Sequence, residues 1–333
     1  MRVGLAGAGR IGEVHLRTLT AHPDVSTVHL YDPDAARVAA LAQEYGACAV
    51  TGADELVAQV DAVVIASPTA THVALLDRAM DAGLPAFCEK PVAAELAQVQ
   101  ALAERARRSG CPVQVGFHYR FDPALRELAE RVAASPGPRL VRVHSTTEFA
   151  PSAEYLAGAG GLIADKLVHE LDMVRWLTGS EVTRVAVLPA VGAPADPETM
   201  TAAVTLELAD GGLAAVWGGY RSVAGFDLTV EVETAEEVVV VGNRRTVAEK
   251  PEPVPASTVV DFRDRFLDAY HAEVDAFLAL ARGAGPNPCD LQEALRTEFL
   301  VEAARAALDE GRVVTVGVQP AGSGMSEGTR KRS

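Results

Sequence analysis

The stretch Val3-Gly4-Leu5-Ala6-Gly7-Ala8-Gly9-Arg10-Ile11-Gly12 decides the fold of this chain. It begins as a short apolar strand, passes through a GxGxxG turn and enters a helix that continues through Val14, Leu16 and Leu19. In a dinucleotide site the first glycine allows the tight turn, the second lets backbone N–H groups approach a pyrophosphate, and the third lets the helix pack on the strand. The helix N-terminus attracts the phosphate charge. The pattern therefore predicts a dinucleotide-binding loop made of Gly7, Gly9, Arg10, Ile11 and Gly12.

Asp32 closes the next predicted strand, Val28-His29-Leu30-Tyr31, and lies twenty residues after Gly12. At this place the fold puts a carboxylate that accepts hydrogen bonds from the adenosine ribose hydroxyls, and this carboxylate would repel a 2′-phosphate. No Arg or Lys stands in Asp32-Pro33-Asp34-Ala35, so NAD is favoured over NADP as the cofactor. Arg10 and Arg37 keep the NADP alternative open.

Length and composition favour a globular protein with two domains. A chain of 333 residues is too long for one typical core, and its hydrophobic content of 49% and charged content of 23% are those of soluble domains. No apolar run approaches the roughly 20 residues that a membrane-spanning helix needs. The N-terminus passes straight into the first strand, without the pattern of a signal peptide, so a cytoplasmic location is expected.

Charge and cysteine spacing argue against nucleic acid, metal and disulfides. The formal net charge of −15 would repel phosphates, and the one dense basic run, Arg330-Lys331-Arg332, lies at the end of the chain. The four cysteines are scattered without a CxxC pair, so we expect reduced, mostly buried thiols and no zinc site. They are Cys48, Cys88, Cys111 and Cys289.

The first 122 residues alternate short apolar strands with amphipathic helices. Strands are predicted at residues 62–66, 85–88 and 112–116, with helices at 71–82 and 93–108. This alternation is typical of a parallel sheet covered on both faces, and with the glycine loop it predicts a Rossmann domain over residues 1–122.

The chain changes character after residue 122. A helix at 123–134 leads into β-rich segments, and further helices are expected at 165–177, 262–282 and 291–310. The β-rich segments are 140–147, 182–187, 202–208, 213–220, 228–233 and 237–241. We therefore expect an α+β substrate domain over residues 123–318 with a large, mostly antiparallel open sheet, followed by a disordered tail at 319–333.

Glu89-Lys90-Pro91 comes just after the fourth predicted strand, at the carboxyl edge where open α/β sheets bind their ligands. Pro91 restricts Lys90 to an extended geometry, which would present the amine at a defined angle. The alternative is a plain loop before the next helix.

Asp165, His169 and Asp172 occur at positions i, i+4 and i+7 of a predicted helix, so they would share one face. A polar stripe on a helix that is otherwise apolar suggests a functional site. The alternative is that Asp165 caps the helix and His169 is a hydrogen-bonded histidine of the core.

With these motifs in place, the sequence resembles the Gfo/Idh/MocA family of sugar and cyclitol oxidoreductases, and within it the myo-inositol 2-dehydrogenase branch. The resemblance covers nearly the whole chain. It rests on GAGRIG (7–12), SPTATH (67–72), EKP (89–91), GFHYRFDP (116–123), GGLIADKLVHELD (160–172) and RFLDAYHAEVDAF (265–277). It implies that Lys90, Asp165 and His169 are the catalytic residues.

The resemblance implies further roles. The cofactor would be lined by Ser67, Thr69, His72, Glu89 and Lys90. The peptide bond between Lys90 and Pro91 would have an unusual geometry, with the cis form as one option. The C-terminal sheet would form homodimers or homotetramers.

Three residues that flank the motifs, His118, Arg120 and Tyr155, are candidate substrate contacts, although Tyr155 could be a packing residue and Arg120 could simply pair with Asp122.

The sequence also departs from the common family pattern. Leu167 stands where many members have glycine, and Lys166 adds a positive charge that we expect to point to solvent rather than bind an anionic substrate group.

The working hypothesis is reversible oxidation of a secondary hydroxyl on a cyclitol or sugar, with hydride transfer to NAD. His169 would be the general base, since its ordinary pKa of about 6.5 suits neutral pH. Lys90 would hydrogen-bond the reacting oxygen, and Asp165 would orient His169 or Lys90 and hold a neighbouring hydroxyl. A keto-sugar reductase, a sugar 3-dehydrogenase and a non-catalytic NAD-binding regulator are the alternatives.

Overall fold

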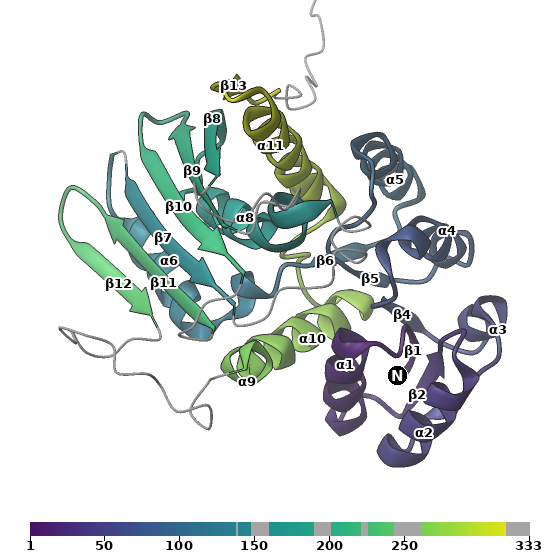
Figure 1. Ribbon diagram of the computed structural model, residues 1–333. Helices are drawn as coiled ribbons and strands as arrows, with labels where there is room; N and C mark the ends of the chain where they lie inside the picture. The colour runs from purple at the N-terminus through teal and green to yellow at the C-terminus, as the bar shows by residue number, and fades with distance from the viewer. Residues whose placement is uncertain (138, 148–159, 190–200, 221–225, 243–260, 318–333) are drawn as a thin grey trace, which may run out of the picture.

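The computed structural model describes residues 1–137, 139–147, 160–189, 201–220, 226–242 and 261–317, and Figure 1 shows their arrangement. The N-terminal elements are β1 (Arg2–Ala6), α1 (Arg10–Ala21), β2 (Thr27–Tyr31), α2 (Ala35–Tyr45), β3 (Cys48–Ala49), α3 (Ala53–Ala58), β4 (Ala62–Ile65), the 3-10 helix η1 (Thr69–Thr71), α4 (His72–Asp81), β5 (Ala86–Glu89), α5 (Leu96–Ser109), β6 (Val113–Gly116) and the 3-10 helix η2 (His118–Phe121). The strands form a parallel sheet in the order β3-β2-β1-β4-β5-β6, so the predicted Rossmann fold is confirmed.

Both faces of this sheet are covered, which explains why its strands are continuous apolar runs. Residues of α3, α4 and α5 pack on one face with Val63 and Ile65, whereas residues of α1 and α2 pack on the other with Val64. Every residue of β4 is at most 1% exposed. Alternate strand residues therefore belong to two different hydrophobic clusters.

The C-terminal elements are α6 (Pro123–Ala134), β7 (Leu140–Thr146), the π-helix η3 (Ile163–Leu167), α8 (Val168–Thr178), β8 (Val182–Pro189), β9 (Thr201–Leu208), β10 (Leu213–Gly219), β11 (Asp227–Glu233), β12 (Val238–Gly242), α9 (Phe262–Arg265), α10 (Leu267–Ala281), α11 (Leu291–Glu310) and β13 (Val314–Thr315). The sheet order is β12-β11-β7-β10-β9-β8-β13. Of the described pairs, β7 with β10 is parallel and the others are antiparallel, which confirms the expected mostly antiparallel sheet.

Local signals set several of these bounds. Helix α6 begins as predicted because the Asp122 carboxylate accepts a hydrogen bond from the Leu125 N–H and Pro123 occupies the first helical position. The predicted helix 262–282 divides into α9 and α10 at Phe266.

Helix α10 lies after the predicted domain boundary in sequence, yet it packs on the N-terminal sheet. Its residues Val274, Phe277 and Leu278 belong to the same hydrophobic cluster as α1 and β1, and Figure 1 shows α10 beside α1. The boundary at residue 122 stays a prediction, but this helix ties the two halves of the chain together directly behind the glycine loop.

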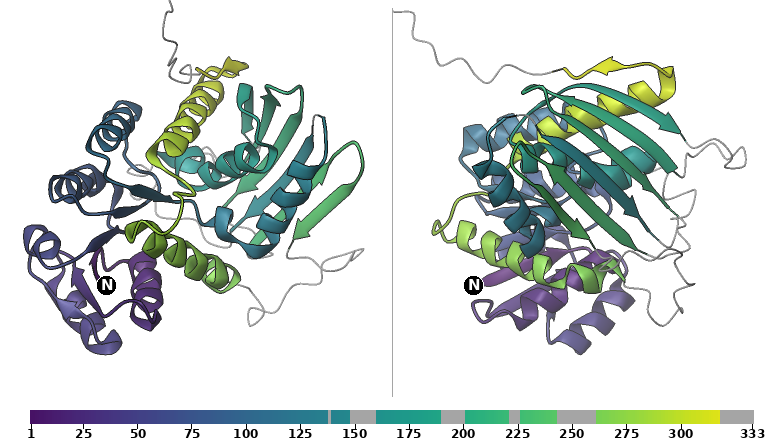
Figure 2. Two further views of the ribbon diagram at one scale, coloured as in Figure 1. Left: turned by 180° about the vertical axis from the view of Figure 1, so that it is seen from behind. Right: turned by 90° about the vertical axis from the view of Figure 1, so that its left-hand side faces the viewer.

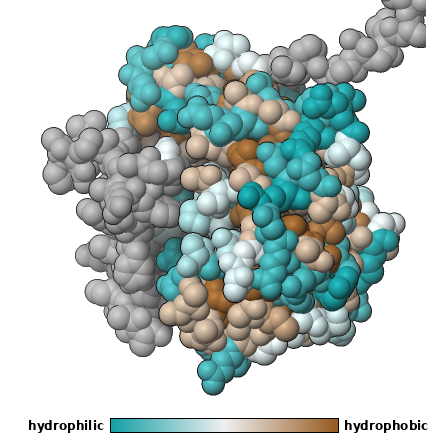
Figure 3. Space-filling view, turned by 90° about the vertical axis from the view of Figure 1, so that its right-hand side faces the viewer, coloured by the Kyte–Doolittle hydropathy of each residue, from teal (hydrophilic) through white to brown (hydrophobic). Residues whose placement is uncertain are grey.

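The large sheet has helices on one face. Helices α6, α8 and α11 lie between it and the N-terminal domain, and the right-hand view of Figure 2 looks onto its other face. Large hydrophobic side chains are exposed on its strands: Leu140, Leu188, Leu213, Trp217, Val238 and Val240. By contrast, the side of the molecule that carries α3, α4 and α5 interleaves hydrophilic and hydrophobic residues (Figure 3).

Within the described residues, no helix combines the length and apolar character needed to cross a membrane. The four cysteines are free, and all but Cys48 are buried, as expected.

Candidate active site

The three glycines of the loop differ in how closely protein atoms surround them. Gly7 has a φ of +113°, and a Cβ there would lie 2.5 Å from the carbonyl oxygen of Ala66 at the end of β4. A Cβ at Gly12 would lie 2.1 Å from the carbonyl oxygen of Gly7, so a side chain would separate the helix from the turn. A Cβ at Gly9 would have no heavy atom within 4 Å. The first and third glycines are thus required by the fold itself, whereas the second leaves open space beside the loop.

The N-terminus of α1 faces this space and fits a pyrophosphate. The first helical hydrogen bond runs from the Glu13 N–H to the Gly9 carbonyl at 2.9 Å. The N–H groups of Arg10, Ile11 and Gly12 precede it and have no acceptor within the helix. Free N–H groups and the positive end of the helix dipole suit an anionic ligand.

Asp32 is held at the edge of the same loop. One carboxylate oxygen accepts from the Ala8 N–H at 2.8 Å, and the other accepts from the Asp34 N–H at 2.9 Å. The Arg37 side chain donates to the Ala8 carbonyl and lies 3.9 Å from the Glu13 carboxylate. The acidic group is therefore fixed beside the glycine loop, its predicted contact with a ribose stays a prediction, and the nearby arginine is engaged by protein groups.

His72 joins the two loops that follow β4 and β5. Its buried ring faces the Ser67 carbonyl at 2.8 Å through Nε2 and the Pro91 carbonyl at 2.9 Å through Nδ1. Burial lowers the pKa of His72, although both carbonyl oxygens favour its charged form. The predicted cofactor contacts of Ser67, Thr69 and His72 stay predictions, and the geometry gives His72 the task of fixing the loops that would carry them.

Lys90 meets Asp165 although 75 residues separate them. The Lys90–Pro91 peptide is cis, and Lys90 is 17% exposed at its side chain. Its Nζ donates to the Asp165 backbone carbonyl at 2.6 Å and lies 3.7 Å from one carboxylate oxygen of Asp165. The amine is therefore held in place by the segment that carries the other predicted catalytic residues.

Tyr220, at the end of β10, completes this arrangement. Its hydroxyl donates to Oδ2 of Asp165 at 2.6 Å. Sequence reasoning missed Tyr220 as a site residue. Tyr220 is the last residue of a predicted strand, and its hydroxyl group there is the signal that could have identified it. The sequence does not show that Asp165 lies opposite this end of the strand.

His169 lies beside these residues in an aromatic surround. Its ring centroid is 6.1 Å from that of Phe117, 4.8 Å from that of His118 and 5.2 Å from that of Tyr119. Burial, together with the charges of Lys90 and Lys166, lowers the pKa of His169 well below its usual value. The imidazole is therefore neutral at physiological pH and able to accept a proton.

A π-helical turn, η3, carries Asp165 and leads directly into α8, which carries His169. Such turns change the angular spacing of side chains and are frequent at functional sites. The common face predicted for the three residues stays a prediction, and Asp172 binds other partners. Its carboxylate accepts from Arg120 at 2.7 and 2.8 Å and from the Thr297 hydroxyl at 2.9 Å.

Comparison with known proteins agrees with this geometry. Residues 1–117 match the model of an oxidoreductase family with an NAD-binding Rossmann fold, and residues 138–316 match the C-terminal alpha/beta domain of the same family. The chain belongs to the Gfo/Idh/MocA oxidoreductase family. The resemblance seen in the sequence motifs is thereby confirmed, and so is NAD as the cofactor of the N-terminal domain.

Several of its relatives are inositol dehydrogenases. The chain is 32% identical to inositol 2-dehydrogenase of Rhizobium meliloti (strain 1021), over 95% of this chain and 99% of that protein. It is 34% identical to myo-inositol dehydrogenase Hyg17 of Streptomyces leeuwenhoekii, over 91% and 96%. The solved structure of a myo-inositol dehydrogenase from Corynebacterium glutamicum ATCC 13032 has a TM-score of 0.86 at 30% identity, over 96% of this chain and 99% of that chain.

The guanidinium of Arg120 is bound by other protein groups. Its guanidinium bonds Asp172, lies 3.4 Å from Glu293 and donates to the Pro288 carbonyl at 3.2 Å. The alternative that Arg120 pairs with Asp122 is contradicted, since Asp122 bonds Arg265 instead. The prediction that Arg120 contacts substrate stays untested, but its side chain is only 5% exposed.

Lys166 is buried, so the expectation that it points to solvent was wrong. It is 7% exposed, and its Nζ donates to the Ser145 hydroxyl at 2.7 Å and lies 3.5 Å from the Glu170 carboxylate. Ser145 donates to Glu170 at 2.5 Å, and Tyr119 does so at 3.3 Å. Burial lowers the pKa of Lys166, although the charge and hydrogen bond of Glu170 oppose this. The Lys166 amine is buried because Ser145 on β7 and Glu170, one helical turn further along on α8, supply acceptors for it.

The His118 ring packs against the His169 ring at a centroid distance of 4.8 Å and stacks on the Tyr270 ring at 5.1 Å. Burial is the largest of the effects that lower its pKa to about 3, so its ring is neutral. Its predicted contact with substrate stays a prediction. Tyr155, the remaining candidate, lies outside the described residues.

Proposed function

We propose that this protein is an NAD-dependent cyclitol dehydrogenase that reversibly oxidises a secondary hydroxyl of an inositol to a ketone. The observation that carries the proposal is the contact of Lys90, at the carboxyl edge of the N-terminal sheet, with Asp165, together with the position of His169 four residues further along the same helical segment. The names of its relatives supply the substrate class.

In this proposal each side chain has a task that its surroundings suit. When bound, NAD supplies the acceptor for the hydride. The neutral imidazole of His169 accepts the hydroxyl proton as the carbonyl forms. Lys90 donates a hydrogen bond to the reacting oxygen and stabilises negative charge there. Asp165 holds Lys90 through its backbone carbonyl and, with Tyr220, offers polar groups for a neighbouring hydroxyl.

The test is the appearance of NADH with a panel of myo-inositol, scyllo-inositol, glucose and glucose 6-phosphate, repeated with NADP. His169→Ala should lower kcat by about 10²- to 10⁴-fold, the usual value of a general base, with little change in NAD affinity. His271→Ala, an exposed histidine on α10, is the matched control and should keep full activity.

Equal loss of kcat and NAD affinity in His169→Ala would count against the assigned role. Turnover only of keto-sugars with NADH would favour a reductase of the same family. Tight NAD binding without turnover of any compound would favour a non-catalytic regulator.

We further propose that the exposed face of the large sheet forms the contact between copies of the chain, giving a homodimer or homotetramer. Support comes from the apolar side chains on its strands, with Trp217 on β10 at 61% exposure and Leu188 on β8 at 71%, both in register with Ala203 of the intervening β9. Trp217→Arg should shift the mass measured by light scattering toward the monomer, and an unchanged mass would contradict this interface. The cytoplasmic location stays a prediction from sequence.

A further inference from the structure

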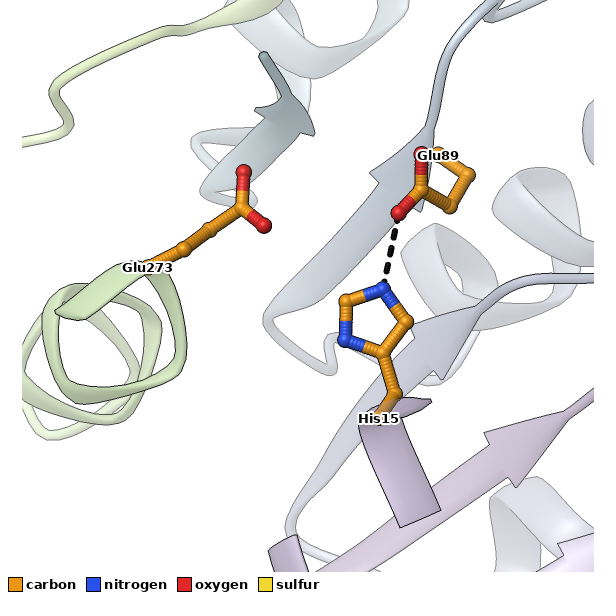
Figure 4. Close-up of side chains that lie close together, drawn as sticks. All are labelled: His15, Glu89 and Glu273. Atoms are coloured by element: carbon orange, nitrogen blue, oxygen red, sulfur yellow. Dashed lines mark hydrogen bonds and ion pairs between the residues drawn. The ribbon is translucent and has the colours of Figure 1, made fainter. Parts of the chain in front are cut away.

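Three buried ionisable side chains meet directly behind the Lys90 loop. They come from separate elements: His15 from α1, Glu89 from the end of β5 and Glu273 from α10 (Figure 4). One oxygen of each carboxylate and one ring nitrogen of His15 lie within 4.8 Å of one another. His15 and Glu273 are fully buried, and Glu89 is 8% exposed.

Much of the hydrogen-bonding capacity of this cluster has no partner among the described residues. Nε2 of His15 lies 2.7 Å from Oε1 of Glu89, a close hydrogen bond. Nδ1 of His15 has no partner, and neither carboxylate oxygen of Glu273 has one. Figure 4 shows the Glu273 carboxylate extending from α10 toward the other two side chains. A buried polar atom without a partner is costly, so these atoms require a common explanation.

The tautomer of His15 provides that explanation. Glu89 is best satisfied by a proton on Nε2, and a neutral imidazole with this proton has an acceptor at Nδ1. A carboxylic acid on Glu273 has one O–H to donate. The unpartnered donor and the unpartnered acceptor thus match, and one buried water could span any remaining gap between them.

We propose that Glu273 is a positioning residue that, as a neutral acid, donates to Nδ1 of His15 through one buried water and so fixes the tautomer in which Nε2–H holds the Glu89 carboxylate beside Lys90. The role of Glu89 and Lys90 in turnover rests on the proposed function. The hydrogen-bonding arrangement does not.

The electrostatics agree with this assignment. Burial, reinforced by the charge of Glu89, raises the pKa of Glu273 well above its usual range. Burial alone would raise the pKa of Glu89 as well, but the His15 hydrogen bond and the charge of Lys90 bring it below its usual value. One carboxyl group is therefore neutral and the other is charged.

A bound cation is the competing explanation, and the geometry favours the proton. Two ligands of a tetrahedral zinc ion, each about 2.0–2.1 Å from the metal, stand roughly 3.3 Å apart. His15 and Glu89 are closer, at a hydrogen-bond distance of 2.7 Å. The neighbours Phe87 and Tyr270 pack with their rings steeply inclined to that of His15 and supply no further charge.

Amide substitution tests the proposal, because a glutamine side chain keeps an N–H donor but cannot be an anion. In Glu273→Gln we expect kcat within about 2-fold of wild type, whereas Glu273→Ala loses the donor and should lower kcat by about 10-fold, as is usual for residues that orient another group. Asp268→Asn, an exposed acid-to-amide change on the same helix, is the control.

Nitrogen NMR of His15 in the resting protein provides a readout that does not need activity. The proposal expects a protonated Nε2 and an accepting Nδ1 in wild type and Glu273→Gln, and a mixed tautomer in Glu273→Ala. It is overturned if the glutamine variant is damaged as much as the alanine variant, or if wild-type protein holds one metal ion per chain that Glu273→Gln loses. If wild type turns over none of the panel, the NMR result still decides this proposal, while the proposed function fails separately.

Discussion

Gly9 and Gly12 should respond differently to the same added methyl group, because only one of them is enclosed by protein. At Gly12 a Cβ would lie 2.1 Å from the Gly7 carbonyl oxygen, which is 1.3 Å closer than the shortest ordinary contact of 3.4 Å. The atom it meets is backbone, so α1 or the turn must move. Gly12→Ala should therefore lower the free energy of unfolding by about 1–3 kcal/mol, the usual cost of overpacking.

Gly9 has an extended backbone, with φ of −71° and ψ of −172°, which alanine adopts readily. Since its Cβ would meet no protein atom, Gly9→Ala should change the free energy of unfolding by less than about 1 kcal/mol. The methyl group would instead occupy space beside the N–H groups of α1. Loss of one hydrogen bond to a charged group, about 1.5–3 kcal/mol, would weaken NAD binding by roughly 10- to 100-fold.

Chemical denaturation and calorimetric titration with NAD measure the two quantities on the same protein samples. Gly9→Ala should keep its stability and lose affinity, whereas Gly12→Ala should lose both. If Gly9→Ala binds NAD as tightly as wild type, the space beside Gly9 is not the pyrophosphate site. Equal destabilisation of the two variants would refute the packing argument.

Three further predictions concern pH, stability and cofactor choice. Because the pKa of His169 lies well below its ordinary value of 6.5 and the neutral ring is the active form, kcat/KM should fall only as pH drops below 6.5; a pH profile with an acid limb centred above 6.5 would contradict this. Asp172→Ala leaves the buried Arg120 guanidinium without its main partner and should cost about 3–5 kcal/mol of stability in a denaturant titration; a loss below about 1 kcal/mol would show that Glu293 compensates. Asp32→Ala should reduce the preference for NAD over NADP by about 10-fold in kcat/KM, the value of one hydrogen bond to a charged group, and an unchanged ratio would place cofactor choice elsewhere.

Features that depend on a few neighbouring residues could be predicted from the sequence. Helices α6 and α11 have the predicted bounds because each combines an apolar period with an aspartate cap, Asp122 and Asp290. The Rossmann sheet could be predicted from apolar runs separated by helices of regular length. The glycine loop indicated its cofactor because Gly7 and Gly12 meet local steric demands and Gly9 leaves open space beside the helix N-terminus.

Features that depend on distant partners could not be predicted in this way. Lys166 is charged and was expected in solvent, but Ser145 and Glu170 supply acceptors that bury it. Glu273 stands among the apolar positions of α10, which is a signal in itself, yet nothing local shows that His15 faces it.

The sequence by itself determined the chemistry available to this protein: an NAD-binding loop, an amine, a carboxylate and an imidazole, in the order that the Gfo/Idh/MocA motifs have along the chain. The tertiary structure decided which of those groups meet, since it places Tyr220 on Asp165 and turns Asp172 away toward Arg120. The physical reason is that spacing along a helix or strand fixes the direction of a side chain only relative to its own element. Whether that direction leads to solvent, to a partner or to the substrate depends on which other elements pack against it.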